Sequence, residues 1–239
     1  APLLEKNGVE ACIAVQADQS EAETRFLLQL ANENNFIKGV VGWVDLQSPN
    51  IQERLEYFSQ FQKLKGFRHV LQGEKKRDLA LTPAFQNGIR QLQSYNFTYD
   101  ILIYPDQLAF TETLVAAFPE QKFIIDHIAK PAIKNGEIDD WKKGMAAIAK
   151  HPNVYCKVSG LVTEGDWNNW KKEDFRPYLD VVAESFDTNR LLFGSDWPVC
   201  LVAAEYDAVL SLAQNYFSYF SEAERRLVFA ENAERFYNL

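Results

Sequence analysis

The sequence predicts an α/β protein of the (β/α)8 class, a distorted TIM barrel whose first strand is missing from this chain. Three observations support this prediction. Short β-branched or apolar runs alternate with longer amphipathic segments along the 239 residues. Seven such runs follow one another at intervals of roughly 30 residues, the length of a βαβ unit. No glycine follows the first run, so the phosphate-binding turn of a nucleotide-binding open sheet is absent.

Seven segments are predicted to be strands because they are short, apolar and rich in β-branched residues. They cover residues 11–17, 39–46, 66–71, 97–104, 122–128, 153–159 and 190–196. Their alternation with helical segments predicts a parallel sheet. Seven strands would leave two open sheet edges, which a closed barrel avoids. We therefore expect one more strand upstream of residue 1 in the native protein.

The segments between the strands carry signals of helix starts. An acidic first turn follows Ser20, and the pairs Ser48-Pro49 and Thr82-Pro83 combine a capping residue with proline at the first helical position. Helices are expected after these residues and over 109–118, 141–150, 175–186, 205–217 and 221–236. No linker rich in Pro, Gly or Ser interrupts the pattern. Residues 1–239 are therefore expected to form a single domain.

Composition excludes several classes of protein. The net charge of −8 and the pI near 5.0 argue against a nucleic-acid or anionic-membrane partner, because both would repel the chain. No apolar run approaches the ~18 residues that span a bilayer, and no signal peptide is visible. The three cysteines, Cys12, Cys156 and Cys200, form no C-x-x-C pair. They indicate free thiols and a cytoplasmic location. A monomer and a homodimer both remain open.

Chemistry-bearing side chains gather at the carboxyl ends of the predicted strands. They are Gln16, Trp43, Asp45, Arg68, His69, Asp100, Tyr104, Asp126, His127, Lys157, Ser159 and Asp196. Parallel strands buried on both faces otherwise read as apolar runs. In a βα barrel the active site forms at the carboxyl ends of the strands. We therefore expect an active site at this end of the barrel.

Strand alternation predicts which of these side chains point inward, because neighbouring residues face opposite ways. The other face of its strand is apolar, so Lys157 is expected to point into the barrel. Arg68 and His69 cannot both point inward on a regular strand, and the pattern leaves open which one does. If His127 points inward, Asp126 faces the helices unless the strand has already ended.

The types of residue at these positions suit the attack of water on a carbonyl group. Asp196 can accept a proton from water, His127 or Lys157 can polarise the carbonyl, and Arg68 can hold a carboxylate or hydroxyl. His127 and Asp196 are also candidate ligands of a divalent metal such as zinc, with further ligands expected on the missing strand. Predicted substrate contacts are Arg68, His69, Lys157, Trp43 and Gln16. Structural roles remain open: a helix cap for Asp196, a core histidine for His127 and a salt bridge for Lys157.

Four segments in this order and spacing resemble a known family. They are "KGFRHVLQGE", "FIIDHIAKP", "NVYCKVSGL" and "RLLFGSDWPVC", and the ending "ENAERFYNL" fits as well. They resemble the metal-dependent-hydrolase-like branch of the amidohydrolase superfamily. That branch contains sugar lactonases of the L-fuconolactonase and L-rhamnonolactonase type. The resemblance extends over essentially the whole chain.

The resemblance implies a distorted (β/α)8 barrel that opens lactone rings with water. Asp196 and His127 then stand in the places of the family's strand-eight aspartate and strand-six histidine. Arg68 and His69 match its strand-four pair, and Lys157 matches its strand-seven lysine. The family begins with a strand ending in His-x-His, which this chain lacks. Metal use varies within the branch.

The predicted function is a hydrolase that opens the ring of a sugar-derived lactone, an aldonolactone. Three alternatives stay open: an amidohydrolase-type decarboxylase, a lyase that uses Lys157 as a Schiff-base nucleophile, and a barrel without catalytic activity. The expected partner is a small-molecule sugar lactone. The sequence does not identify which lactone it is.

Overall fold

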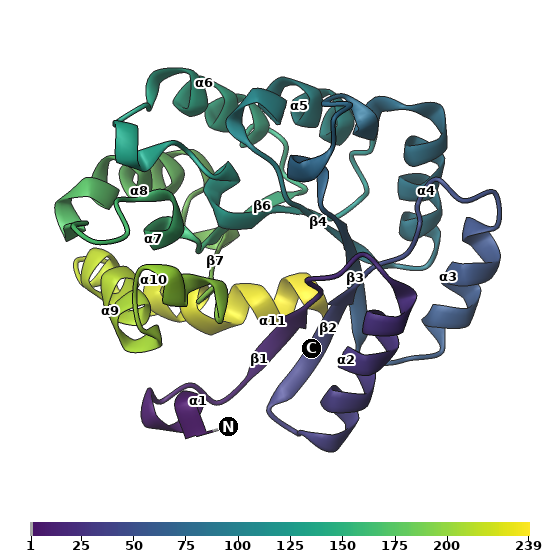
Figure 1. Ribbon diagram of the computed structural model, residues 1–239, viewed down its shortest axis with the longest axis horizontal. Helices are drawn as coiled ribbons and strands as arrows, with labels where there is room; N and C mark the ends of the chain where they lie inside the picture. The colour runs from purple at the N-terminus through teal and green to yellow at the C-terminus, as the bar shows by residue number, and fades with distance from the viewer. Residues whose placement is uncertain (1) are drawn as a thin grey trace.

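The computed structural model describes residues 2–239, and its central feature is a curved parallel sheet (Figure 1). Its strands are β1 (Cys12–Val15), β2 (Ile37–Gly42), β3 (Leu64–His69), β4 (Thr98–Ile101), β5 (Phe123–Ile125), β6 (Val154–Val158) and β7 (Leu191–Phe193). The strands lie in sequence order and every neighbouring pair is parallel. Sequential order is the topology of a barrel, whereas a doubly wound sheet permutes its strands. The prediction of a distorted barrel that lacks one strand is confirmed.

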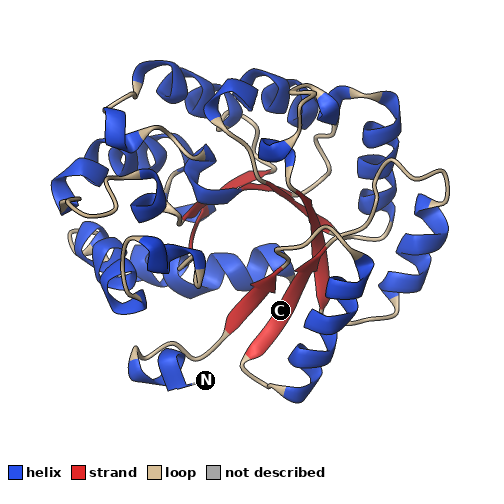
Figure 2. Ribbon diagram, in the orientation of Figure 1, coloured by secondary structure: helices blue, strands red, loops and turns tan. Residues whose placement is uncertain are grey.

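Helices form an outer layer around the sheet (Figure 2). They are α1 (Pro2–Lys6), α2 (Glu21–Glu33), α3 (Ile51–Ser59), α4 (Pro83–Ser94), α5 (Leu108–Ala117), α6 (Asp139–Ile148), α7 (Leu161–Glu164), α8 (Lys172–Phe186), α9 (Tyr206–Phe217), α10 (Glu222–Arg226) and α11 (Asn232–Tyr237). Close packing of this layer depends on Gly88, because a Cβ there would lie 2.3 Å from the Leu46 carbonyl oxygen. None of the helices within residues 2–239 has the length and apolarity that a membrane span needs.

The two faces of the sheet pack against different partners, as strand alternation requires. Val41, Ile124 and Leu192 point into the barrel and form a small interior core with Phe236 and Tyr237. Residues at alternate positions, such as Val40 and Phe123, belong to the large core between the sheet and the helices.

Several predicted boundaries are wrong. The helix expected directly after Ser48 begins at Ile51, because the Ser48 hydroxyl accepts a hydrogen bond from the Asn50 amide at 3.2 Å within a turn. The strands end one to four residues earlier than expected; β2 stops at Gly42 and β5 at Ile125, for example. The short helix α7 was not expected at all.

Helix α11 occupies the open side of the sheet. In Figure 1 it is the yellow helix that runs past β7 toward β1 and β2. Its Phe236 ring packs on Tyr155 of β6, with the ring centroids 4.9 Å apart. The buried Asn232 side chain donates hydrogen bonds to the carbonyl oxygens of Thr188 (2.7 Å) and Leu191 (2.8 Å). These two bonds fix the start of α11 against β7.

Replacement of Asn232 should therefore weaken the whole fold. Asn232→Ala leaves two buried carbonyl groups without their donor, and we expect the free energy of unfolding to fall by about 1–3 kcal/mol. Chemical denaturation monitored by circular dichroism measures this change. Asn215→Ala is the matched control, since Asn215 is exposed and bonds only within α9. Equal losses in the two variants would contradict the anchoring role of Asn232.

Candidate active site

Four charged side chains meet inside the barrel at the carboxyl ends of the strands. Arg68 on β3 donates to Asp126 Oδ2 at 2.8 Å. Lys157 on β6 lies 2.7 Å from Asp126 Oδ1 and also donates to Asp100 on β4. Both carboxylates are fully buried, and both cations are close to nine-tenths buried. We call Arg68, Asp100, Asp126 and Lys157 the charged floor.

The charges of this floor stabilise one another. Burial alone would raise the pKa of Asp126, but Lys157 and Arg68 together hold it well below its usual range. Burial would likewise lower the pKa of Lys157, and the carboxylates of Asp100 and Asp126 raise it well above its usual value. Lys157 is therefore a permanent ammonium ion. Burial raises the pKa of Asp100, and the Lys157 ammonium opposes that rise. With Asp100 ionised, two cations balance two carboxylates, as buried charges require.

Tyr237 of α11 closes the charged floor from the opposite end of the barrel. Its hydroxyl donates to Asp100 Oδ2 at 2.8 Å, and Lys157 Nζ lies 5.9 Å from the centre of its ring. Sequence reasoning missed Tyr237, because it belongs to a helix and not to a strand end. It placed Asp100 and Asp126 at strand ends without assigning them a role.

A left-handed turn follows β5 and orients the next histidine. His127, Ile128, Ala129 and Lys130 have φ values of 52°, 47°, 58° and 48°, a conformation that costs about 1–2 kcal/mol for each residue with a Cβ. Because the strand ends at Ile125, both Asp126 and His127 reach the barrel interior. Strand alternation predicted opposite directions for Asp126 and His127 unless the strand had already ended, and this exception applies here.

Space beside the His127 ring depends on Gly160. The backbone of Gly160 has a φ of 64°, and a Cβ there would lie 2.7 Å from Cβ of His127. The next strand end supplies the partner of the ring, since His127 Nδ1 and Ser159 Oγ are 2.8 Å apart. The backbone of Gly160 thus packs against one side of His127, and the Ser159 hydroxyl bonds to its Nδ1.

The other ring nitrogen of His127 faces Asp196. His127 Nε2 and Asp196 Oδ1 are 3.6 Å apart, which is longer than a direct hydrogen bond. Burial lowers the pKa of His127 to about 3, so its imidazole is neutral at physiological pH. The Ser159 hydroxyl can donate to Nδ1, which leaves the ring proton on Nε2. An N–H donor and a carboxylate therefore lie side by side at the mouth of the barrel.

Asp196 has the properties of a general base. Burial raises the pKa of Asp196 to about 6, and Lys130 partly opposes this rise. A carboxyl group with a raised pKa is a stronger proton acceptor that is still ionised at neutral pH. Strongly shifted titratable groups that share a cleft are typical of functional sites.

The other predicted substrate contacts, Gln16, His69 and Trp43, lie in two groups. The buried Gln16 side chain donates to the Arg68 carbonyl at 3.0 Å, while Arg68 donates to the Gln16 carbonyl. His69 faces the helix layer: its Nε2 lies 2.8 Å from Glu74, and Trp43 Nε1 donates to its Nδ1 at 3.4 Å. Gln16 thus orients Arg68, and His69 pairs with Trp43 apart from the charged floor.

A metal would find an incomplete set of ligands here. Catalytic zinc sites usually have three protein ligands. Within residues 2–239, no group of three or more His, Cys, Asp or Glu side chains could hold a metal ion. His127 and Asp196 offer two donor atoms. The described residues therefore do not make a complete site, and the steps proposed below do not pass through a metal.

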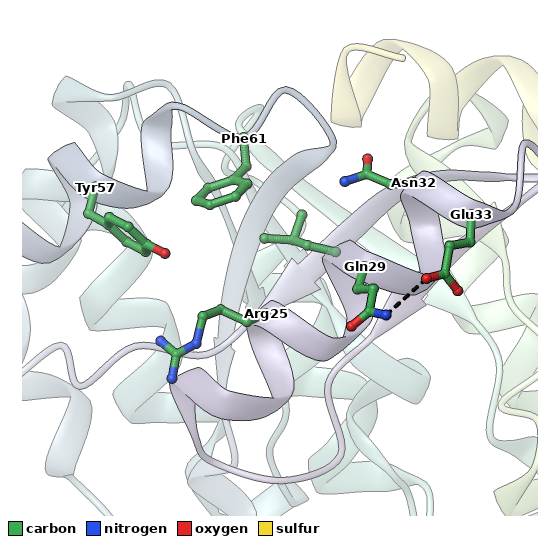
Figure 3. Close-up of a pocket in the computed structure, with 7 residues that line it drawn as sticks. Arg25, Gln29, Asn32, Glu33, Tyr57 and Phe61 are labelled. Carbon is green, nitrogen blue, oxygen red and sulfur yellow. Dashed lines mark hydrogen bonds between the residues drawn. The ribbon is translucent and has the colours of Figure 1, made fainter.

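A separate groove of about 300 Å³ lies on the outer surface between α2 and α3 (Figure 3). Arg25, Gln29, Tyr57 and Phe61 are among the side chains that line it. Its polar groups bond along their own helix, such as Gln29 to Glu33 at 2.9 Å. The groove contains none of the strand-end side chains, so we do not assign the reaction to it.

Comparison with curated proteins gives relatives along the full chain. An L-fucono-1,5-lactonase of Burkholderia multivorans is 39% identical, with 100% of this chain and 84% of the relative covered. An L-fucono-1,5-lactonase of Burkholderia ambifaria is 33% identical, with 100% of this chain and 83% of the relative covered.

Solved structures agree with these relatives. A crystal structure of an amidohydrolase from Burkholderia multivorans with bound zinc superposes with a TM-score of 0.96 at 38% identity. The match covers 100% of this chain and 86% of that one. A family model described as amidohydrolase matches residues 1–239. By its strand order, its strand-end residues and these matches, the chain belongs to the amidohydrolase family.

Proposed function

We propose that the protein is a hydrolase that opens the ring of a sugar-derived lactone by attack of water on the carbonyl carbon. The observation that carries this proposal is the pairing of a raised-pKa carboxylate, Asp196, with a neutral imidazole, His127, 3.6 Å away. The names of the two Burkholderia relatives support lactone hydrolysis. The aldonolactone class follows from the same names.

The two groups divide the chemistry between them. Asp196 accepts a proton from water as the water oxygen bonds to the carbonyl carbon. His127 donates from Nε2 to the carbonyl oxygen and stabilises the charge that develops there. The ring C–O bond then breaks, and the proton held by Asp196 passes to the leaving alkoxide. Water and lactone thus become one hydroxy acid.

The charged floor supports the substrate from below. Lys157 and Arg68, paired with Asp100 and Asp126, place fixed charges of both signs near the site where the oxyanion forms, in surroundings of low dielectric constant. The Lys157 ammonium already bonds to Asp100. The Arg68 guanidinium bonds to Asp126 and Gln16 through its two terminal nitrogens, while its Nε is buried without a partner among the described residues. We therefore assign them an electrostatic role and not the main contacts to the sugar.

The alternative functions receive less support. A Schiff base needs a neutral lysine amine, and the pKa of Lys157 is raised well above its usual value by Asp100 and Asp126. The curated relatives with assigned activities carry lactonase names, which favours neither a decarboxylase nor a barrel without activity.

We also propose a divalent metal cofactor and a cytoplasmic location. The zinc in the crystallised relative supports a divalent metal, for which Asp196 and a His127 whose Nε2 carries no proton would be two ligands here. A bound divalent ion would supply a Lewis acid for the carbonyl. The free thiols of Cys12, Cys156 and Cys200 support a cytoplasmic location.

Removal of the base should abolish turnover. In Asp196→Asn the carboxamide cannot accept the proton of water, and we expect kcat to fall by roughly 10²–10⁴ with the fold intact. Lactone hydrolysis is followed by acid release, and circular dichroism checks the fold. Asp140→Asn is the control, since Asp140 is exposed on α6. Retained activity in Asp196→Asn would disprove the assignment.

The pH profile should show the ionisation of Asp196. The carboxyl group must be ionised to act as a base, so kcat/KM should fall as pH drops through about 6. His127 stays neutral over this range, because its pKa is about 3. Initial rates between pH about 5 and about 8 measure the profile. A profile that stays flat to the acid end would contradict this role.

A panel of sugar lactones tests the reaction and the metal together. We expect saturable acid release from one member of the panel, and the same assay with a chelator measures whether a divalent metal contributes to the rate. Turnover that resists the chelator would argue against a metal. No turnover across the panel, with the barrel folded, would refute the lactonase proposal and favour a decarboxylase or a binding protein.

A further inference from the structure

The left-handed turn after β5 places a second side chain at the mouth of the barrel. The turn ends at Lys130, whose amide donates to the His127 carbonyl at 2.8 Å. Left-handed residues with side chains cluster where a fold must hold a functional group in place. The proposed reaction gives a role to His127, the first left-handed residue of this turn. It gives none to Lys130, the last one.

Lys130 pairs with Glu164, the last residue of α7. Lys130 Nζ and Glu164 Oε1 are 3.4 Å apart, and only 14% and 19% of the two side chains are exposed. Nζ also lies 5.7 Å from the centre of the Tyr104 ring. The contact is long for a charge-assisted hydrogen bond, so both groups keep bonding capacity for a ligand.

This pair lies close to the reacting groups. The charges of Lys130 and Glu164 act on Asp196, Lys130 lowering the pKa of Asp196 and Glu164 raising it. The cations of the charged floor are engaged by buried carboxylates, whereas Lys130 stands at the rim with a single ion-pair contact. Lys130 belongs to the same short turn as His127, and its amide bonds to the His127 carbonyl at 2.8 Å, so its ion pair with Glu164 borders the place where a substrate over His127 and Asp196 would put its ring substituents.

We propose that Lys130 and Glu164 form a subsite that binds two neighbouring hydroxyl groups of a polyhydroxylated lactone. The ammonium of Lys130 donates to one hydroxyl, and the carboxylate of Glu164 accepts from the other. A hydroxyl group both donates and accepts, so adjacent hydroxyls match a paired cation and anion. The subsite rests on the proposed lactone hydrolysis and sets its preference for sugar lactones over lactones without hydroxyls.

The test compares two substrates in single variants. Lys130→Met and Glu164→Gln should each raise KM for the sugar lactone that the protein hydrolyses by roughly tenfold to a hundredfold, the loss of a hydrogen bond to a charged group. KM for δ-valerolactone, which has no hydroxyls, should change by less than about twofold. Initial rates give KM and kcat, and thermal melting checks the fold.

The chain offers a matched control pair. Lys134 and Asp166 join the same two segments at 3.9 Å, but their side chains are 63% and 41% exposed. Lys134→Met and Asp166→Asn should leave KM for both lactones unchanged. A similar rise with either control would mean that such pairs only hold the segments together, and would overturn the subsite.

The remaining outcomes are equally decisive. An equal rise of KM for both lactones, or no rise for either, in the Lys130 and Glu164 variants would refute hydroxyl recognition. Failure of the unaltered protein to hydrolyse any lactone would refute the proposed function, and the subsite with it. The unaltered protein thus separates the two failures.

Discussion

The contact of Asp126 with Arg68 and Lys157 is the interaction on which the interior of this barrel depends. It joins side chains from β3, β6 and the end of β5 at one buried point. An isolated buried charge is strongly unfavourable, so each of the three is stabilised in this position by its oppositely charged partners. The same contact keeps Lys157 cationic and holds Arg68 beside Gln16. In the proposed reaction, Asp196 and His127 act in the electrostatic field of these buried charges.

The turn after β5 positions His127 and Lys130 next to the charged floor. Four successive left-handed residues are unfavourable, and their cost is offset by packing, since Ile128 and Ala129 are completely buried in the core. The Trp141 indole adds a hydrogen bond of 2.7 Å to the Ile128 carbonyl. Packing in the middle of the turn thus holds its two functional ends, His127 and Lys130, in position.

The sequence predicted the strands, their order and the end of the barrel that carries the chemistry, because spacing and apolar runs reflect the sheet directly. Alternation also predicted that Lys157 points inward. Alternation could not predict the directions of the Asp126 and His127 side chains, because these depend on the residue at which the strand ends. Tyr237 escaped prediction for another reason: its partner, Asp100, is 137 residues away, and no local pattern reports such a contact. No sequence pattern singled out Lys130 and Glu164, whose pairing and burial are visible only in the structure.

The position of α11 has a consequence for folding kinetics. The helix follows all seven strands in the chain, yet it supplies Phe236 and Tyr237 to the barrel interior. The contact of Tyr237 with Asp100 therefore forms only after the entire sheet has been synthesised and curved. Contacts this distant in sequence slow folding. Until then interior residues such as Val41 and Ile124 would lack the packing that Phe236 and Tyr237 provide, and exposed apolar surface of this kind makes a partly folded chain prone to aggregation.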